Sequence, residues 1–340
     1  MSSELLLLIM VVIVGLAYDF VNGFHDAANA IATSISSNCL SPRTAILLAT
    51  CFNFIGALSH TAVAYTIGKG VVESNIVTQP ILLAALLGAI AWNLITWRLG
   101  LPSSSTHALV GGLIGGALIA TNFNWSVLLM PGITRIAIAM VLAPFAGLLL
   151  SMLVIAAIMW PLHWLKINHR PFNKRLKKLQ ILSAAWMSFS HGMNDAQNAM
   201  GIITIALMTY GAISEFHVPM SIRILCAFSM GAGTMFGGWR IIRTIVNQLS
   251  GKETLPVQGF AAQTSAGGVI LISSLLGLPI STSHAISSSV IGTTAASRIG
   301  AANWRVGGQM VVAWIITVPA AMLFAAIFEL LITYGQNALS

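Results

Sequence analysis

The sequence consists mainly of long apolar runs, and these leave few folds open to it. Five runs precede a basic connector and five follow it, at residues 4–36, 43–69, 79–99, 103–121 and 133–160, then 179–213, 221–247, 258–276, 281–300 and 306–332. Such runs suit helices that cross about 30 Å of hydrocarbon, and the period-2 alternation of a membrane barrel is absent. Only 7% of the residues are charged, against about 25% in soluble domains. We therefore predict an all-α polytopic protein in a lipid bilayer.

The two sets of runs contain the same polar motif, which indicates an internal duplication. Residues 23–30 read GFHDAANA and residues 192–199 read GMNDAQNA, so five of the eight positions match. The chain is accordingly divided into a first membrane repeat at 1–162, a basic connector at 163–178 and a second membrane repeat at 179–340.

The basic residues predict the topology, because loops rich in Lys and Arg remain in the cytoplasm. With the N-terminus outside and one crossing per run, only Lys69, Arg135 and Arg223 of the 16 basic residues fall outside. An odd number of crossings in each half turns the second half over, which predicts an inverted-topology repeat. We expect a multi-pass protein of a bacterial plasma membrane, with both termini outside and a cytoplasmic connector. The net charge of +8 comes from these loops, so no nucleic-acid partner is expected, and a homodimer is left open.

Two features indicate broken helices. The first run of each half exceeds 30 residues, which as one straight helix would measure about 50 Å at 1.5 Å per residue. Each is therefore predicted to break or bend at its motif. The fourth runs, 103–121 and 281–300, open with hydroxyl residues and are rich in Gly and Ser. These two runs are predicted to form re-entrant hairpins.

The repeated motif pairs a carboxylate with an amide. Asp26 and Asn29, like Asp195 and Asn198, are three residues apart and share one helix face. The alternative is that each Asp only locks helix packing, but ionisable groups inside a membrane are costly and usually functional. We predict that these four residues bind a coupling cation, with Asp26 and Asp195 as metal ligands if that cation is sodium.

A second duplicated motif reads GLPSSSTH at residues 100–107 and GLPISTSH at residues 277–284. Pro suits the start of a helix and Ser or Thr suits its cap. A helix N-terminus with added hydroxyls binds oxyanions, whereas the simpler interpretation is a cap that also helps helices pack. The hydroxyl residues predicted to bind substrate are Ser104, Ser105, Thr106, Ser281, Thr282 and Ser283.

Histidines supply a second tier of candidates. His107 and His284 close the two hydroxyl motifs, where a packing role is more common than proton transfer. His25 and Asn194 occupy equivalent positions, so the two cation sites need not be alike. No catalytic residue and no cofactor is predicted, and the protein is not expected to be an enzyme.

Together, the paired G-x-x-D-x-x-N-A motifs, the P-x-S-[ST]-[ST]-H motifs and the basic connector resemble the PiT inorganic phosphate transporters over nearly the whole chain. The resemblance implies a symporter that imports inorganic phosphate with H+ or Na+, although a few bacterial relatives carry sulfate. It assigns the cation to the Asp and Asn residues and phosphate to the hydroxyls. Many members have Asn where this chain has His25, and bacterial proton-linked members often share the His. The short connector lacks the regulatory domain of longer relatives.

The motifs contain no Lys or Arg, which favours a mechanism in which a bound cation neutralises Asp26 and Asp195 before an oxyanion binds. Transport of a neutral metal-phosphate complex fits the same pattern. Two other classes stay open: an anion channel, which would need basic rings, and an intramembrane hydrolase that uses Ser, His and Asp. The sequence does not distinguish a rocking motion from an elevator motion.

Overall fold

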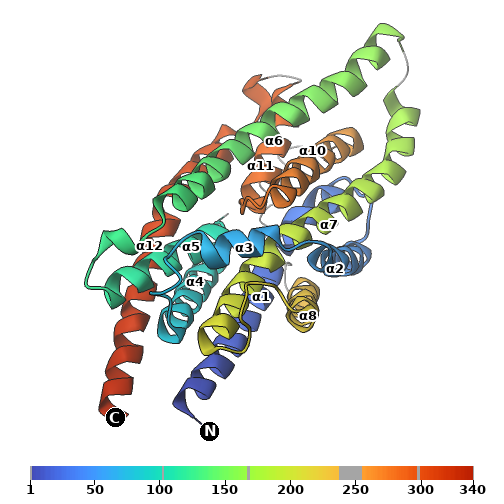
Figure 1. Cartoon of the computed structure of the whole chain (residues 1–340). Helices are drawn as coiled ribbons and strands as arrows, with labels where there is room; N and C mark the ends of the chain where they lie inside the picture. Colours follow the sequence, from blue (N-terminus) through green and yellow to red (C-terminus); the bar gives the residue numbers. More distant parts are fainter. Residues whose placement is uncertain (1, 102, 167–168, 237–254, 297–298, 340) are drawn as a thin grey trace.

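The computed structural model describes residues 2–101, 103–166, 169–236, 255–296 and 299–339, and in this part of the chain the structure is helical, with one isolated bridge between Val72 and Leu128 (Figure 1). In the first half, the helices are α1 (Ser3–Ser36), α2 (Pro42–Ser59), α3 (Ala62–Lys69), α4 (Gln79–Leu99), α5 (Ser105–Ala120), the 3-10 turn η1 (Trp125–Val127) and α6 (Met130–Trp164). In the second half, they are α7 (His169–Tyr210), α8 (Met220–Phe236), α10 (Pro256–Leu275), α11 (Thr282–Ala295), the 3-10 turn η2 (Ile299–Ala301) and α12 (Trp304–Leu339). The predicted all-α class is confirmed.

Several helices have the length and composition of membrane spans. Within the described residues, α1, α2, α4, α6 and α12 are long and apolar enough to cross a membrane. The outer faces of α6 and α12 expose large apolar side chains, including Leu142, Leu153, Ile315 and Leu331. Since lipid is as apolar as these side chains, such surfaces suit a bilayer and not water.

The predicted break at the Asp motif of each first helix is wrong. α1 and α7 each continue as one helix through the motif, and the glycines there serve close packing instead. A Cβ at Gly23 would run into the backbone oxygen of Met230 on α8, and a Cβ at Gly192 would run into that of Asn53 on α2. α7 also begins inside the predicted connector, because Leu176 is buried against Val257 of α10.

The chain breaks instead at the second motif. α4 ends at Gly100, which adopts a left-handed conformation with φ of 68°, and Gly277 after α10 has φ of 66°. Glycine enters this conformation without the steric cost of a Cβ. The chain then reverses, so that α4 packs on α5 and α10 packs on α11. Each pair forms a helical hairpin with the hydroxyl motif at its tip.

The first helix of each half packs against the other half. α1 packs on α8 and α2 packs on α7, so each first helix lies against the second helix of the other half. The contacts correspond one to one: Gly56 meets the backbone of Phe189, and Gly233 meets that of Phe20, its repeat equivalent. Small residues allow this approach of two helix backbones. The halves therefore form one interlocked bundle.

The equivalent helices α1 and α7 run in opposite directions. In Figure 1, α1 starts at the end of the molecule where both chain termini lie, whereas α7 starts at the opposite end, beside the end of α6, and runs toward the termini. One cavity touches both Glu4, near the start of α1, and Tyr210, at the end of α7. The two equivalent helices are therefore antiparallel.

Candidate functional site: two carboxylates between two hairpin tips

The two hairpin tips begin their second helices in the same way. The Ser104 hydroxyl accepts a hydrogen bond from the His107 backbone N–H at 3.2 Å, and the Ser281 hydroxyl accepts one from His284 at 3.3 Å. These are N-cap bonds, which satisfy backbone donors at a helix start. Ser104 and Ser281 therefore hold the tips in shape, and their neighbours Ser105, Thr106, Thr282 and Ser283 are the hydroxyls that face other groups.

Asp26 joins the two hairpins. Its carboxylate accepts hydrogen bonds from Ser105 of the first hairpin at 3.1 Å and from Ser283 of the second hairpin at 2.6 Å. Asp26 is only 2% exposed, so both bonds form away from water. Hydrogen bonds to a charged group contribute about 1.5–3 kcal/mol each. The packing thus brings one predicted cation ligand and two predicted substrate hydroxyls into direct contact.

Asp195 repeats half of this arrangement. Thr282 donates to its carboxylate at 2.9 Å, and this bond is the repeat equivalent of Ser105 to Asp26. The equivalent of the second bond is missing, because Thr106 instead accepts from Asn198 at 3.0 Å and donates to the Ile280 backbone oxygen at 3.3 Å. The site is therefore asymmetric, with Asp26 held by both hairpins.

A histidine lies beside each carboxylate, but the two histidines occupy different positions in the repeated sequence. His25 lies 3.0 Å from Asp26 as its sequence neighbour, and His191 lies 3.2 Å from Asp195 one helical turn away. The repeat equivalents of these histidines are Asn194 and Asn22. His191 was not among the predicted site residues, although its spacing of four residues from Asp195 on one helix was the available signal.

The three buried groups Asp26, His191 and Asp195 could hold one cation. One ligand atom from each lies within 4.8 Å of the others. Two ionised carboxylates at that separation repel by about 3–4 kcal/mol at an effective dielectric constant of about 20. A bound proton or metal ion would remove this repulsion, so the cluster favours a cation.

The other predicted residues occupy supporting positions. Asn194 donates to the Ser274 hydroxyl at 2.8 Å and so ties α7 to α10. The rings of His107 and His284 meet edge to face, with centroids 5.6 Å apart, and Trp314 donates to His284 at 2.7 Å. These histidines connect the two tips to each other and to α12. The side chain of Asn29 lies outside the described residues.

Two further residues, which lie outside the motifs, also contact the site. Tyr18 donates to the Ser105 backbone oxygen at 2.9 Å, and Asn53 lies 3.1 Å from His191. Asn53 also donates to Thr234 of α8 at 3.1 Å, so α2, α7 and α8 meet beside the carboxylates. Neither residue belongs to a repeated motif. Asn53 is visible in the sequence as a polar residue within an apolar run, which favours a bridge between helices, whereas only the packing identifies Tyr18.

The hydrolase alternative does not match this geometry. A hydrolytic triad places a histidine between the nucleophilic serine and the aspartate. Here Ser105 and Ser283 donate directly to Asp26. The arrangement joins hydroxyl donors to carboxylates, which suits binding of ions and not activation of a nucleophile.

The chain is similar to known proteins over most of its length. The family described as "Phosphate transporter family" matches residues 22–325. A probable low-affinity inorganic phosphate transporter from Rhizobium meliloti is 42% identical over 325 residues, covering 94% of this chain and 95% of the relative. A protein of the same description from Bacillus subtilis is 42% identical, covering 96% and 97%.

A solved structure has the same fold. It is described as the sodium-dependent phosphate transporter, and it matches with a TM-score of 0.85 at 24% identity, covering 96% of this chain and 99% of its own. The names found are those of transporters and not of enzymes. This membrane protein therefore belongs to the phosphate transporter family.

Proposed function

We propose that this protein is a symporter that imports inorganic phosphate together with H+ or Na+. The observation that carries the proposal is the double hydrogen bond from Ser105 and Ser283 to Asp26. The hydroxyls suited to bind an oxyanion are the same ones that Asp26 holds, so the charge on this carboxylate decides whether they are free to turn to a substrate.

The coupling step follows from this competition. When a proton or sodium ion binds at Asp26 or Asp195, the carboxylate becomes a weaker acceptor, and Ser105, Thr282 and Ser283 can donate to phosphate oxygens. The N-termini of α5 and α11 add backbone N–H groups and positive dipole ends at the same place. The cation then raises the affinity for phosphate, and by linkage phosphate raises the affinity for the cation by the same factor.

The carboxylates also favour phosphate over sulfate. Near neutral pH, phosphate carries at least one O–H that can donate to a carboxylate, whereas sulfate carries none. Sulfate has no O–H to donate, so an ionised carboxylate beside it would lack that bond, and an unpaired buried charge is costly. We therefore assign phosphate as the substrate.

Alternating access is proposed to use the repeat. The interlocked halves, the opposite directions of α1 and α7, and the two termini at one end support an inverted repeat with the termini outside and the connector in the cytoplasm. Of the 13 basic residues assigned to the cytoplasm, Arg240, Arg243, Lys252 and Arg298 lie outside the described residues. The sidedness can be checked by labelling single cysteines from outside intact cells.

The decisive test is uptake of labelled phosphate into proteoliposomes, with proton and sodium gradients imposed separately and sulfate as a competitor. We expect one of the two gradients to drive uptake and excess sulfate to leave it unchanged. Uptake that neither gradient affects would contradict coupling and favour a channel.

Ser283→Ala should lower phosphate affinity by about tenfold, because one hydrogen bond to a charged group is lost. Phosphate titration of initial uptake rates measures the change. Ser288→Ala on the same helix is the matched control, since Ser288 is equally buried and bonds only locally, to the Ala285 backbone oxygen at 3.0 Å. Equal losses in the two variants would show that Ser283 acts through packing alone.

A further inference from the structure

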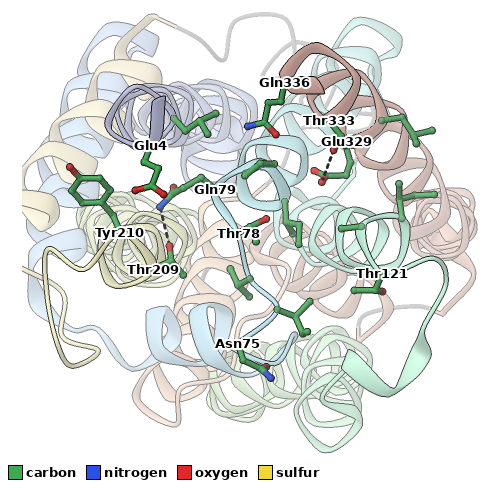
Figure 2. A pocket seen from close by; sticks show the side chains of 18 of the residues that line it. Glu4, Asn75, Thr78, Gln79, Thr121, Thr209, Tyr210, Glu329, Thr333 and Gln336 are labelled. Atoms are coloured by element: carbon green, nitrogen blue, oxygen red, sulfur yellow. Dashed lines mark hydrogen bonds between the residues drawn. The ribbon is translucent and has the colours of Figure 1, made fainter. Parts of the chain in front are cut away.

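A second polar cavity lies at the end of the molecule that holds both termini. It has a volume of about 950 Å³ and lies between the starts of α1 and α4 and the ends of α5, α7 and α12 (Figures 1 and 2). α5 separates it from the carboxylate site, because the 15 residue steps from Ser105 to Ala120 span about 22 Å at 1.5 Å per residue. We call this space the terminal cavity.

The terminal cavity is acidic. Its lining includes Glu4 and Glu329, two of the five glutamates of the chain, and the described lining residues contain no Lys, Arg or His. In Figure 2, the carboxylates of these two glutamates approach the cavity from different sides, Glu4 from α1 and Glu329 from α12. An approaching phosphate ion would meet two like charges here, so the cavity does not suit an anion.

Glu329 is the unusual member. It is only 3% exposed, and its Oε1 accepts a bond of 3.4 Å from Thr333. Its Oε2 is buried and has no hydrogen-bond partner within the described part of the chain. A buried carboxylate oxygen without a donor is costly unless a cation or a proton satisfies it.

Gln79 presents a second oxygen of the same kind. Both donors of its amide group are used, by the Ala206 backbone oxygen at 2.7 Å and the Thr209 hydroxyl at 2.9 Å. These bonds fix the orientation of the amide, and its buried Oε1 has no partner among the described residues. The cavity thus contains two fixed oxygen acceptors and one exposed carboxylate.

We infer that the terminal cavity binds a hydrated divalent cation of the Mg2+ type, with Glu4, Glu329 and the Gln79 oxygen as its protein groups. Hard divalent cations take oxygen ligands, and Mg2+ retains several of its waters. The volume leaves room for those waters, at about 30 Å³ each. Two carboxylates match the charge of one such ion.

The role of the bound cation rests on the proposed function, the import of phosphate. With the termini outside, as proposed, the terminal cavity lies at the outer end of the bundle, from which imported phosphate approaches. A bound divalent cation would cancel the two negative charges at that end and allow the anion to pass.

The test is a titration of the purified protein with Mn2+, followed by electron paramagnetic resonance in the absence of phosphate. Wild-type protein should bind Mn2+, and Mg2+ should displace it at concentrations at which Na+ does not. Glu329→Gln and Glu4→Gln should each weaken binding by about tenfold or more, since each removes one charged ligand. Because Glu4 is exposed, its variant reports on the site even if Glu329→Gln folds poorly.

Two controls make the result specific. Glu215→Gln removes the same charge from an exposed loop outside the cavity and should bind Mn2+ like the wild type. Asp26 and Asp195 belong to the other candidate cation cluster, so the titration is repeated on the double variant Asp26→Asn with Asp195→Asn, in which the terminal cavity should still bind Mn2+. No Mn2+ bound to that double variant, wild-type binding in both Glu4 and Glu329 variants, or equal displacement by Na+ would overturn the inference. None of these readings depends on phosphate uptake, so failure of the proposed function would be seen separately.

Discussion

Asp26→Asn is expected to reduce coupled phosphate uptake by about 100-fold while leaving the protein folded, because hydrogen bonds to a charged group contribute about 1.5–3 kcal/mol each and Asp26 accepts one from a hydroxyl of each hairpin. The side-chain amide of Asn does not take up a proton near neutral pH, and it carries no charge to neutralise a sodium ion. The Ser105 and Ser283 hydroxyls therefore lose the group that couples them to the cation. Asp195→Asn should also lower uptake, through its bond with Thr282.

Initial uptake rates in proteoliposomes measure this effect, and thermal unfolding of the purified variants checks the fold. Asp19→Asn is the matched control, since Asp19 is a fully buried carboxylate on the same helix. Within the described residues, no hairpin hydroxyl donates to Asp19, so it is not joined to a hairpin tip. If Asp19→Asn and Asp26→Asn reduce uptake equally, the hydroxyl bonds to Asp26 are not what couples cation and anion.

Gly192→Ala should destabilise the folded protein, with a fall in unfolding temperature of about 5–10 °C. The added Cβ would run into the backbone oxygen of Asn53, which a helix backbone cannot move aside as a flexible side chain can. Overpacking costs about 1–3 kcal/mol and sometimes more, and each kcal/mol lowers the unfolding temperature by about 2–4 °C in a chain of this size class. Gly23→Ala should act similarly, because Gly23 meets Met230 in the equivalent way.

The control for this prediction is Gly268→Ala. Gly268 also lies within a helix, α10, but a Cβ there would meet nothing within 4 Å. Both substitutions gain the same helix propensity, about 1 kcal/mol. Gly268→Ala should therefore be neutral or slightly stabilising. An unfolding temperature for Gly192→Ala that matches that of Gly268→Ala would show that the crossing of α2 and α7 tolerates a larger separation.

The prediction of continuous versus broken helices shows where local sequence is insufficient. Length and the motif glycines suggested a break in residues 4–36 and 179–213, yet α1 and α7 are unbroken. A glycine in a helix can mark a bend or a close approach by another helix, and the two have the same local sequence. Only the positions of α2 and α8 show that close approach is the reason.

The site, too, was predicted from the sequence only in part. The motif carboxylates and hydroxyls were found because they are repeated, and a duplicated polar group in an apolar run is visible without a structure. His191 and Glu329 were missed because repetition does not mark them; the first half, for example, has Asn22 where the second half has His191. Their roles depend on the distance from His191 to Asp195 and on the position of Glu329 in the terminal cavity.

The sequence alone determined that this is a helical membrane protein made of two related halves, each with a carboxylate motif and a hydroxyl motif. Composition and repetition are local properties, so they can be counted along the chain. Only the tertiary structure decided that Ser283 of the second half donates to Asp26 of the first, while Thr106 turns to Asn198 instead of Asp195. The physical reason is that helix packing joins residues far apart in the sequence: α1 packs on α8 and α2 packs on α7, and hydroxyls from both hairpins lie against Asp26.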